Sequence, residues 1–159
     1  MFSFLQRNAK SFQLHAPAPG NVLPLANVPD AAFAGNLLGE GFAVEPEGHQ
    51  IFSPCDGIIA LIAPTKHAIA LTTENGLEIL VHVGLDTVEL NGEGFEVHVQ
   101  IEQKVSKGDL LLSFDPRVLT AHNKSSITPV VVTNSASKVQ KAVFSANADA
   151  KAPCCLTLK

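Results

Sequence analysis

The chain has 159 residues, which suits a single globular domain with a substantial core. Acidic residues outnumber basic residues by 15 to 11, so the formal charge is −4 and nucleic acid is not an expected partner. Apolar residues make up 46% of the chain and charged residues 16%, which excludes an intrinsically disordered protein.

Residues 1–12 are expected to form a flexible N-terminal segment. The alternative is a short amphipathic tail that touches a membrane surface, formed by Phe2, Phe4 and Leu5 together with Arg7 and Lys10. The segment lacks the basic region and long apolar stretch of a secretory signal. Residues 13–159 are expected to form one domain.

Most apolar stretches in the rest of the chain are short and end at a turn signal, which favours a sandwich or barrel of short strands. The predicted strands are Asn21–Leu25, Gly41–Glu45, Gly57–Ala63, His67–Thr72, Leu77–Val83, Glu96–Ile101, Leu110–Phe114, Val130–Thr133 and Cys154–Leu158. Two short helices are predicted, over Arg117–Lys124 and Ala136–Phe144. The predicted fold class is therefore all-β with minor helix.

Two turns share a pattern. Residues 16–22 and 53–59 both read small-Pro-x-x-Gly-x-apolar, which fits an internal duplication and fits two unrelated turns equally well.

Cys55, Cys154 and Cys155 form no C-x-x-C motif, so neither a disulfide framework nor a zinc knuckle is expected, and a reducing cytoplasm is the expected location.

Residues 67–84 contain an Asn75-Gly76 pair between two strand-like runs, the strongest short-range signal for a hairpin. A two-residue loop pairs Ile69 with His82, whereas a four-residue loop pairs His67 with His82. Both registers place the two imidazoles on one face of the sheet, within roughly 4.5–8 Å at the β-carbons. A three-residue loop would break this relation. Both registers also place on that face Thr65, Ile69, Leu71 and Leu80.

Two adjacent imidazoles fit three roles. They can ligate zinc, which needs three or four protein ligands. One can be a nucleophile while the other orients the incoming group. Both can also be hydrogen-bonded core histidines, and the residues alone leave these roles open.

The hairpin and the segment after it resemble a known family. The run LVHVGLDTVELNGEGF at 80–95 closely resembles the phosphohistidine signature of the glucose-type IIA component of the bacterial phosphoenolpyruvate-dependent sugar phosphotransferase system. Other segments fall in the family's order and approximate spacing: Asn27–Ala34, Leu38–Gly41, Ser53–Gly57, Thr65–Ala68 and Ser126–Val131. The resemblance covers roughly residues 14–159.

This resemblance implies an antiparallel β-sandwich with a duplicated hybrid motif. It also implies a phosphocarrier that accepts a phosphoryl group from the phosphohistidine of HPr and passes it to the cysteine of a IIB domain of a sugar permease. His82 matches the histidine that carries the phosphoryl group, and the family favours its Nε2. His67 matches the second active-site histidine, which orients the phosphate, and Thr65 a supporting polar residue. The positions that match partner-binding residues are Asp30, Phe33, Leu37, Leu38, Leu80 and Asp86.

Some positions depart from the family pattern. Ala31, Ala32, Ala63 and Leu80 stand where larger or aromatic docking side chains are expected, which leaves possible regulatory partners open. No cofactor is expected to be required, and zinc at His67 and His82 is expected only if a partner adds a ligand. Membrane association is expected to be indirect, through the permease.

Two other functions compete with the relay. One is a non-catalytic docking regulator of transporters or metabolic enzymes that uses the same apolar face. The other is a zinc metallopeptidase, because His82-x-Gly84-x-Asp86 echoes its metal motif. Such enzymes need a downstream H-x-H, and the segment Val97–Val99 supplies only His98, which disfavours this function.

Overall fold

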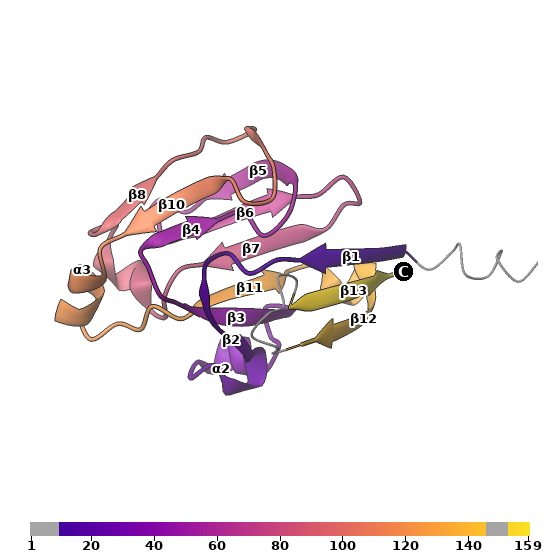
Figure 1. The fold of residues 1–159 in the computed structure, drawn as a ribbon, viewed down its shortest axis with the longest axis horizontal. Coiled ribbons are helices and arrows are strands. Elements are labelled where there is room, and N and C mark those ends of the chain that lie inside the picture. Colours follow the sequence, from indigo (N-terminus) through magenta and orange to yellow (C-terminus); the bar gives the residue numbers. More distant parts are fainter. Residues whose placement is uncertain (1–9, 146–152) are drawn as a thin grey trace, which may run out of the picture.

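The computed structural model describes residues 10–145 and 153–159 (Figure 1). Its strands are β1 (Lys10–Leu14), β2 (Gly20–Pro24), β3 (Glu40–Pro46), β4 (Gln50–Phe52), β5 (Gly57–Ile62), β6 (Ala68–Thr72), β7 (Glu78–His82), β8 (Phe95–Val97), β9 (Lys104–Val105), β10 (Leu110–Phe114), β11 (Thr128–Val132), β12 (Val139–Phe144) and β13 (Cys154–Leu158). The helices are short: η1 (Leu25–Asn27), α2 (Ala31–Ala34), η2 (Thr87–Leu90), α3 (Pro116–Ala121) and α4 (Ser135–Lys138).

Three antiparallel sheets make up the fold, which confirms the predicted all-β class. The largest has the order β2-β3-β11-β7-β6-β5-β9, and the smaller ones are β4-β10-β8 and β1-β13-β12. The β4-β10-β8 sheet and α3 lie toward one end of the molecule, and β12 and β13 toward the other (Figure 1). The two turns with the shared Pro-Gly pattern enter β2 and β5, near opposite edges of the large sheet.

The main core fills one face of the large sheet. Alternate residues of β6 and β7 are fully buried, and they pack with side chains from the two smaller sheets. Each fully buried Leu or Ile contributes about 1.5–3 kcal/mol relative to an exposed one. The largest of these side chains include Leu14, Phe42, Ile51, Ile69, Leu71, Ile79, Leu112 and Leu156.

A second, smaller core lies on the other side of the sheet. Phe33 of α2 and Leu25 of η1 pack there with Val131 of β11, and Leu80 contacts the cluster while remaining half-buried. Asp30 begins α2, because its carboxylate accepts a hydrogen bond from the backbone N–H of Ala32 at 3.0 Å. This cap sets the position of Phe33 beside the end of β7.

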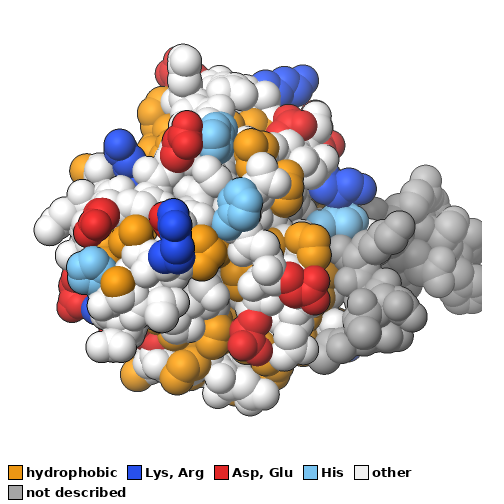
Figure 2. Space-filling model, turned by 60° about the vertical axis from the view of Figure 1, so that its left-hand side comes forward, with side chains coloured by type: hydrophobic (Ala, Val, Ile, Leu, Met, Phe, Trp, Pro, Cys, Tyr) orange, Lys and Arg blue, Asp and Glu red, His pale blue; other side chains and the backbone are white. Residues whose placement is uncertain are grey.

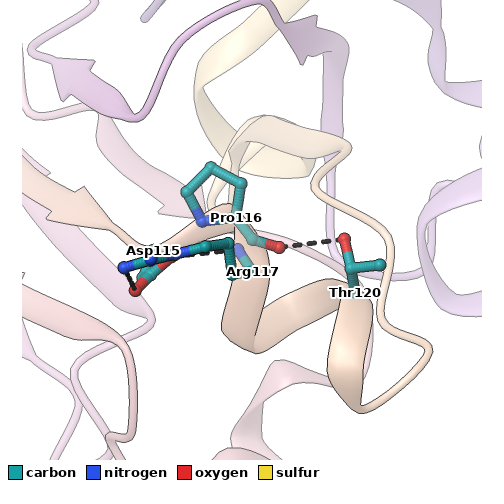
Figure 3. A network of polar contacts seen from close by, with 4 residues as sticks. All are labelled: Asp115, Pro116, Arg117 and Thr120. Carbon is teal, nitrogen blue, oxygen red and sulfur yellow. Dashed lines mark hydrogen bonds and ion pairs between the residues drawn. The ribbon is translucent and has the colours of Figure 1, made fainter.

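The predicted helix over Arg117–Lys124 is present as α3 but is shorter. Asp115 caps it by accepting from the backbone N–H of Arg117 at 2.9 Å, and the same carboxylate receives two bonds from the Arg117 guanidinium (Figure 3). Thr120 donates back to the carbonyl of Pro116. The chain leaves the helix at His122, and Asn123 is left-handed with φ 56°.

Several predicted boundaries were wrong. Of the helix expected over Ala136–Phe144, only Ala136–Lys138 is helical, as part of α4, because Val139–Phe144 pairs with β13 as strand β12. The strand expected over Glu96–Ile101 ends at Val97. Of the segment expected to be flexible, residues 10–12 lie in β1 and residues 1–9 lie outside the described residues.

Within the described residues, no helix is long and apolar enough to cross a membrane.

Candidate active site

The β6–β7 hairpin has a register that neither predicted loop length allows. Ala68 pairs with His82 and Thr72 with Glu78, so three residues, 74–76, form the turn. The reason is Thr73. Its backbone N–H donates to the carbonyl of Leu77 at 2.9 Å, and its hydroxyl accepts from the N–H of Leu77 at 3.0 Å. These bonds pair Thr73 with Leu77, whereas a two-residue loop over Asn75-Gly76 would pair Glu74 with Leu77.

This register changes which side chains share a face. Leu80 and His82 point to the same side as Ala68, while Ile69, Leu71 and Val81 point into the main core. The prediction that Ile69 and Leu71 surround the imidazoles was therefore wrong, because a shift of one residue moves a strand's side chains to the other face.

The two imidazoles nevertheless lie in contact, because His67 belongs to the turn before β6 and does not follow the alternation of side chains along that strand. Their ring centroids lie 4.8 Å apart with an interplanar angle of 82°. His67 precedes β6 and follows a turn in which Lys66 is left-handed, with φ 63°. The backbone carbonyl of His67 accepts from the N–H of Val83 at 2.7 Å, which fixes the turn against the end of β7. Proximity of His67 and His82 is confirmed, although the expected register is not.

Gly84 determines the protonation pattern of His82. The Nδ1 of His82 lies 2.8 Å from the carbonyl oxygen of Gly84. A carbonyl oxygen can only accept a hydrogen bond, so Nδ1 carries the proton and the neutral ring keeps its lone pair on Nε2. This is the nitrogen that the family resemblance favours.

The backbone at Gly84 requires glycine. Its φ is +81°, and a Cβ there would lie 2.4 Å from Cγ2 of Thr87 and 2.8 Å from the carbonyl oxygen of Ser125. Thr87 in turn donates its hydroxyl to the carbonyl of Val83 at 2.6 Å. The carbonyl that orients His82 is therefore held in a tightly packed turn.

The second imidazole is held by Thr65. The Thr65 hydroxyl lies 2.8 Å from Nδ1 of His67. His67 is buried, with only 6% of its surface exposed. With one ring nitrogen engaged by the hydroxyl, Nε2 is the remaining polar atom of His67. On the other side of the site, the Phe33 ring contacts His82 edge-on, with centroids 5.2 Å apart.

Burial lowers the pKa of both imidazoles. For His82, the hydrogen bond to Gly84 and the carboxylates of Asp30 and Asp86 oppose this effect without cancelling it. For His67, the neighbouring His82 adds to the lowering, and a backbone hydrogen bond at Thr65 opposes it. Both rings are therefore neutral at pH 7, as a nucleophilic imidazole must be.

NMR titration of the two imidazoles is expected to give midpoints below 6.5, the value for an unperturbed histidine. Between the lowered pKa and 6.5 the unfolded chain binds more protons than the folded chain, so stability falls as the pH drops through this window. Long-range ¹H–¹⁵N spectra measure both midpoints, and they report whether Nδ1 of His82 carries the proton. Spectra of His67→Gln and His82→Gln assign the signals. A midpoint at or above 6.5 for either ring would contradict the effect of burial.

The residues expected to bind partners differ in how much surface they offer. Leu37 is 77% and Leu38 39% exposed, whereas Phe33 is 3% exposed and offers almost none. Asp86 is exposed and left-handed, with φ 57°. Val88, which is 50% exposed in η2, was not predicted. It lies two residues after Asp86 in the run that resembles the phosphohistidine signature.

Exposed hydrophobic side chains occur together with histidines on one face of the molecule (Figure 2). Lys, Arg, Asp and Glu side chains are interspersed there as single groups.

The described residues do not make a complete zinc site. Within them, no group of three or more His, Cys, Asp or Glu side chains is arranged to hold a metal ion. His67 and His82 offer two nitrogens, whereas zinc takes three or four protein ligands. Zinc bound to this pair with a ligand from a partner stays a prediction.

Comparison with known proteins gives a consistent result. Residues 12–138 match the family described as phosphoenolpyruvate-dependent sugar phosphotransferase system, EIIA 1. Among solved structures, the chain is similar to the glucose permease IIA from Mycoplasma capricolum, with 33% sequence identity and a TM-score of 0.82. That match covers 94% of this chain and 96% of the other.

Proposed function

The chain belongs to the EIIA 1 family of the phosphoenolpyruvate-dependent sugar phosphotransferase system and is a phosphocarrier of that system, and we propose that His82 carries the phosphoryl group. The observation that supports this assignment is the bond from Nδ1 of His82 to the Gly84 carbonyl. It leaves a lone pair on Nε2 in a half-buried ring that is neutral at pH 7.

The transfer needs no group other than the two reacting proteins. The Nε2 lone pair of His82 attacks phosphorus in the phosphohistidine of HPr, and a new P–N bond forms. The P–N bond in HPr breaks, and its imidazole keeps the electron pair. The proton on Nδ1 of His82 stays in place, and the bond to Gly84 stabilises the positive charge that develops on the ring. A cysteine thiolate of the IIB domain then attacks phosphorus, and His82 leaves with its electron pair.

His67 is proposed to orient the phosphoryl group. When the Thr65 hydroxyl donates to Nδ1 of His67, Nε2 carries the proton and can donate to a phosphoryl oxygen. The 4.8 Å between the ring centroids suits one group held by both rings. Thr65 acts through His67, so its role is to fix the ring and its tautomer.

Family membership implies that the protein interacts with HPr and with a IIB or permease component. We propose that this contact uses the exposed Leu37, Leu38 and Val88 together with the half-buried Leu80 and with Phe33, whose ring contacts His82. Asp30 and Asp86 are proposed to meet basic groups at the rim. Regulatory targets would bind the same surface. The three free cysteines fit a reducing cytoplasm, and we propose that the protein associates with the membrane indirectly, through the permease.

The test is intact mass spectrometry after incubation with phosphoenolpyruvate, enzyme I and HPr. The expected result is a gain of one acid-labile phosphate per chain, which a IIB domain removes. A gain that no IIB domain removes would favour the docking regulator. No gain, with phosphorylated HPr shown to be present, would contradict the relay.

A further inference from the structure

The site faces a charge problem once a phosphoryl group is bound. The group brings about two negative charges. Asp30 and Asp86 are close enough to His82 to affect its ionisation, and both imidazoles are neutral at pH 7. The phosphorylated His82 ring carries one positive charge, because its Nδ1 proton stays in place. This charge offsets only part of the negative charge of the phosphoryl group and the two carboxylates, and the neutral His67 adds none.

Two lysines lie on segments that border the site, and only one is free to supply further positive charge. The ammonium of Lys124 is bonded to the carboxylate of Glu89. Lys66 is exposed, and it takes part in none of the ion pairs found among residues 10–145 and 153–159. It lies between Thr65 and His67, the hydrogen-bonded pair that orients the second imidazole.

The backbone of Lys66 is unfavourable for a lysine. Its φ of 63° lies in the left-handed region, where glycine and asparagine are the usual residues. The conformation is fixed by the turn between β5 and β6, in which the N–H of Lys66 donates to the carbonyl of Ala63 at 2.8 Å. Lys66 therefore occupies a position where the backbone conformation favours glycine or asparagine. Residues with such unfavourable backbone angles are concentrated at functional sites.

The lysine stem passes close to Gly92. Its Cδ lies 3.8 Å from the point that a Cβ on Gly92 would occupy, so it runs over a backbone without a side chain. Gly92 has φ +90° and lies two residues after η2, which Asp86 precedes and which contains Val88. No packed side chain at Gly92 holds the flexible four-carbon stem in place.

We propose that Lys66 is a phosphoryl-binding residue, whose ammonium moves to the phosphoryl oxygens when His82 is phosphorylated. This inference rests on the proposed function of His82. The ammonium offsets the negative charge of the bound group and of the two rim carboxylates. It also stabilises the charge on the equatorial oxygens as the group arrives from HPr.

The test is ³¹P NMR of the phosphorylated protein, titrated with acid in the absence of any partner. In Lys66→Asn, which suits the left-handed turn, the titration midpoint of the phosphoryl group is expected to rise by about 0.5 unit, because a nearby cation favours the dianion. Lys66→Arg is expected to restore the wild-type midpoint. Lys104→Asn, in β9, is the matched control that removes a lysine elsewhere.

Two further measurements make the result decisive. The rate of phosphoryl uptake from HPr is expected to fall about threefold to tenfold in Lys66→Asn, while its Tm stays equal to that of the wild type or rises. Lys66→Gly serves if the asparagine variant folds poorly. An unchanged midpoint in a phosphorylated Lys66 variant overturns this inference alone. The absence of any phosphohistidine signal in the wild type overturns the proposed function instead.

Discussion

Replacing His82 by Gln is expected to abolish phosphorylation completely. Glutamine has a similar reach, and its side-chain amide can still bond to the Gly84 carbonyl that holds Nδ1 in the wild type. Its amide nitrogen has no available lone pair, so it cannot form the P–N bond. Intact mass after incubation with phosphoenolpyruvate, enzyme I and HPr should therefore show no gain, at any time and at any HPr concentration.

The matched control for this variant is His98→Gln. His98 is exposed and bonds to Ser113 in the β4-β10-β8 sheet, so its replacement removes an imidazole without touching the site. It should take up one phosphate like the wild type. Stoichiometric labelling of the His82 variant would show that another residue is the acceptor, and the neighbouring His67 would be the first to test.

The hairpin shows how far local sequence rules reach. Asn75-Gly76 correctly predicted the turn and brought the two histidines to the same end of the sheet. The register was wrong because Thr73 uses its hydroxyl and its backbone to close a three-residue turn. Whether a threonine bonds to the backbone or continues a strand depends on the sheet that forms around it, which a single sequence does not display.

Other elements were missed for similar reasons. The helix α2 is only four residues long, Ala-Ala-Phe-Ala, which is too short for a helical period to appear. Strand β12 was predicted as helix because Asn134 or Ser135 can cap a helix at that point, whereas its pairing with β13 decides the outcome. The error at β12 therefore lies where a contact distant in sequence overrides local preference.

The proximity of His67 and His82 was predicted, but through a hairpin register that the structure does not have. The resemblance supplied both histidines as candidate site residues. Neither the hairpin nor the resemblance supplied the role of the Gly84 carbonyl, since the need for glycine there arises from packing against Thr87 and Ser125. Nor did they predict that Phe33 is buried against the His82 ring, because α2 was not predicted.

Replacing His67 by Gln is expected to separate uptake from transfer. His82 keeps its nucleophilic Nε2 and its bond to Gly84, so labelling by HPr should still reach one phosphate per chain. The glutamine amide can donate to the phosphoryl group, but Thr65 no longer fixes a ring against His82. Loss of one preorganised donor costs about 10²-fold in comparable sites, so transfer to a IIB cysteine should slow by about that factor.

Rapid-quench measurements of both half-reactions test this separation. Thr65→Val provides the comparison, because it keeps the His67 imidazole while removing the hydroxyl 2.8 Å from Nδ1. If His67 acts by donating from an oriented ring, Thr65→Val should slow transfer less than His67→Gln does, and His67→Ala should slow it more. Equal transfer rates in wild type and His67→Gln would mean that the second imidazole has only a structural role. The order of the three variants thus distinguishes a hydrogen-bond donor from a packing residue.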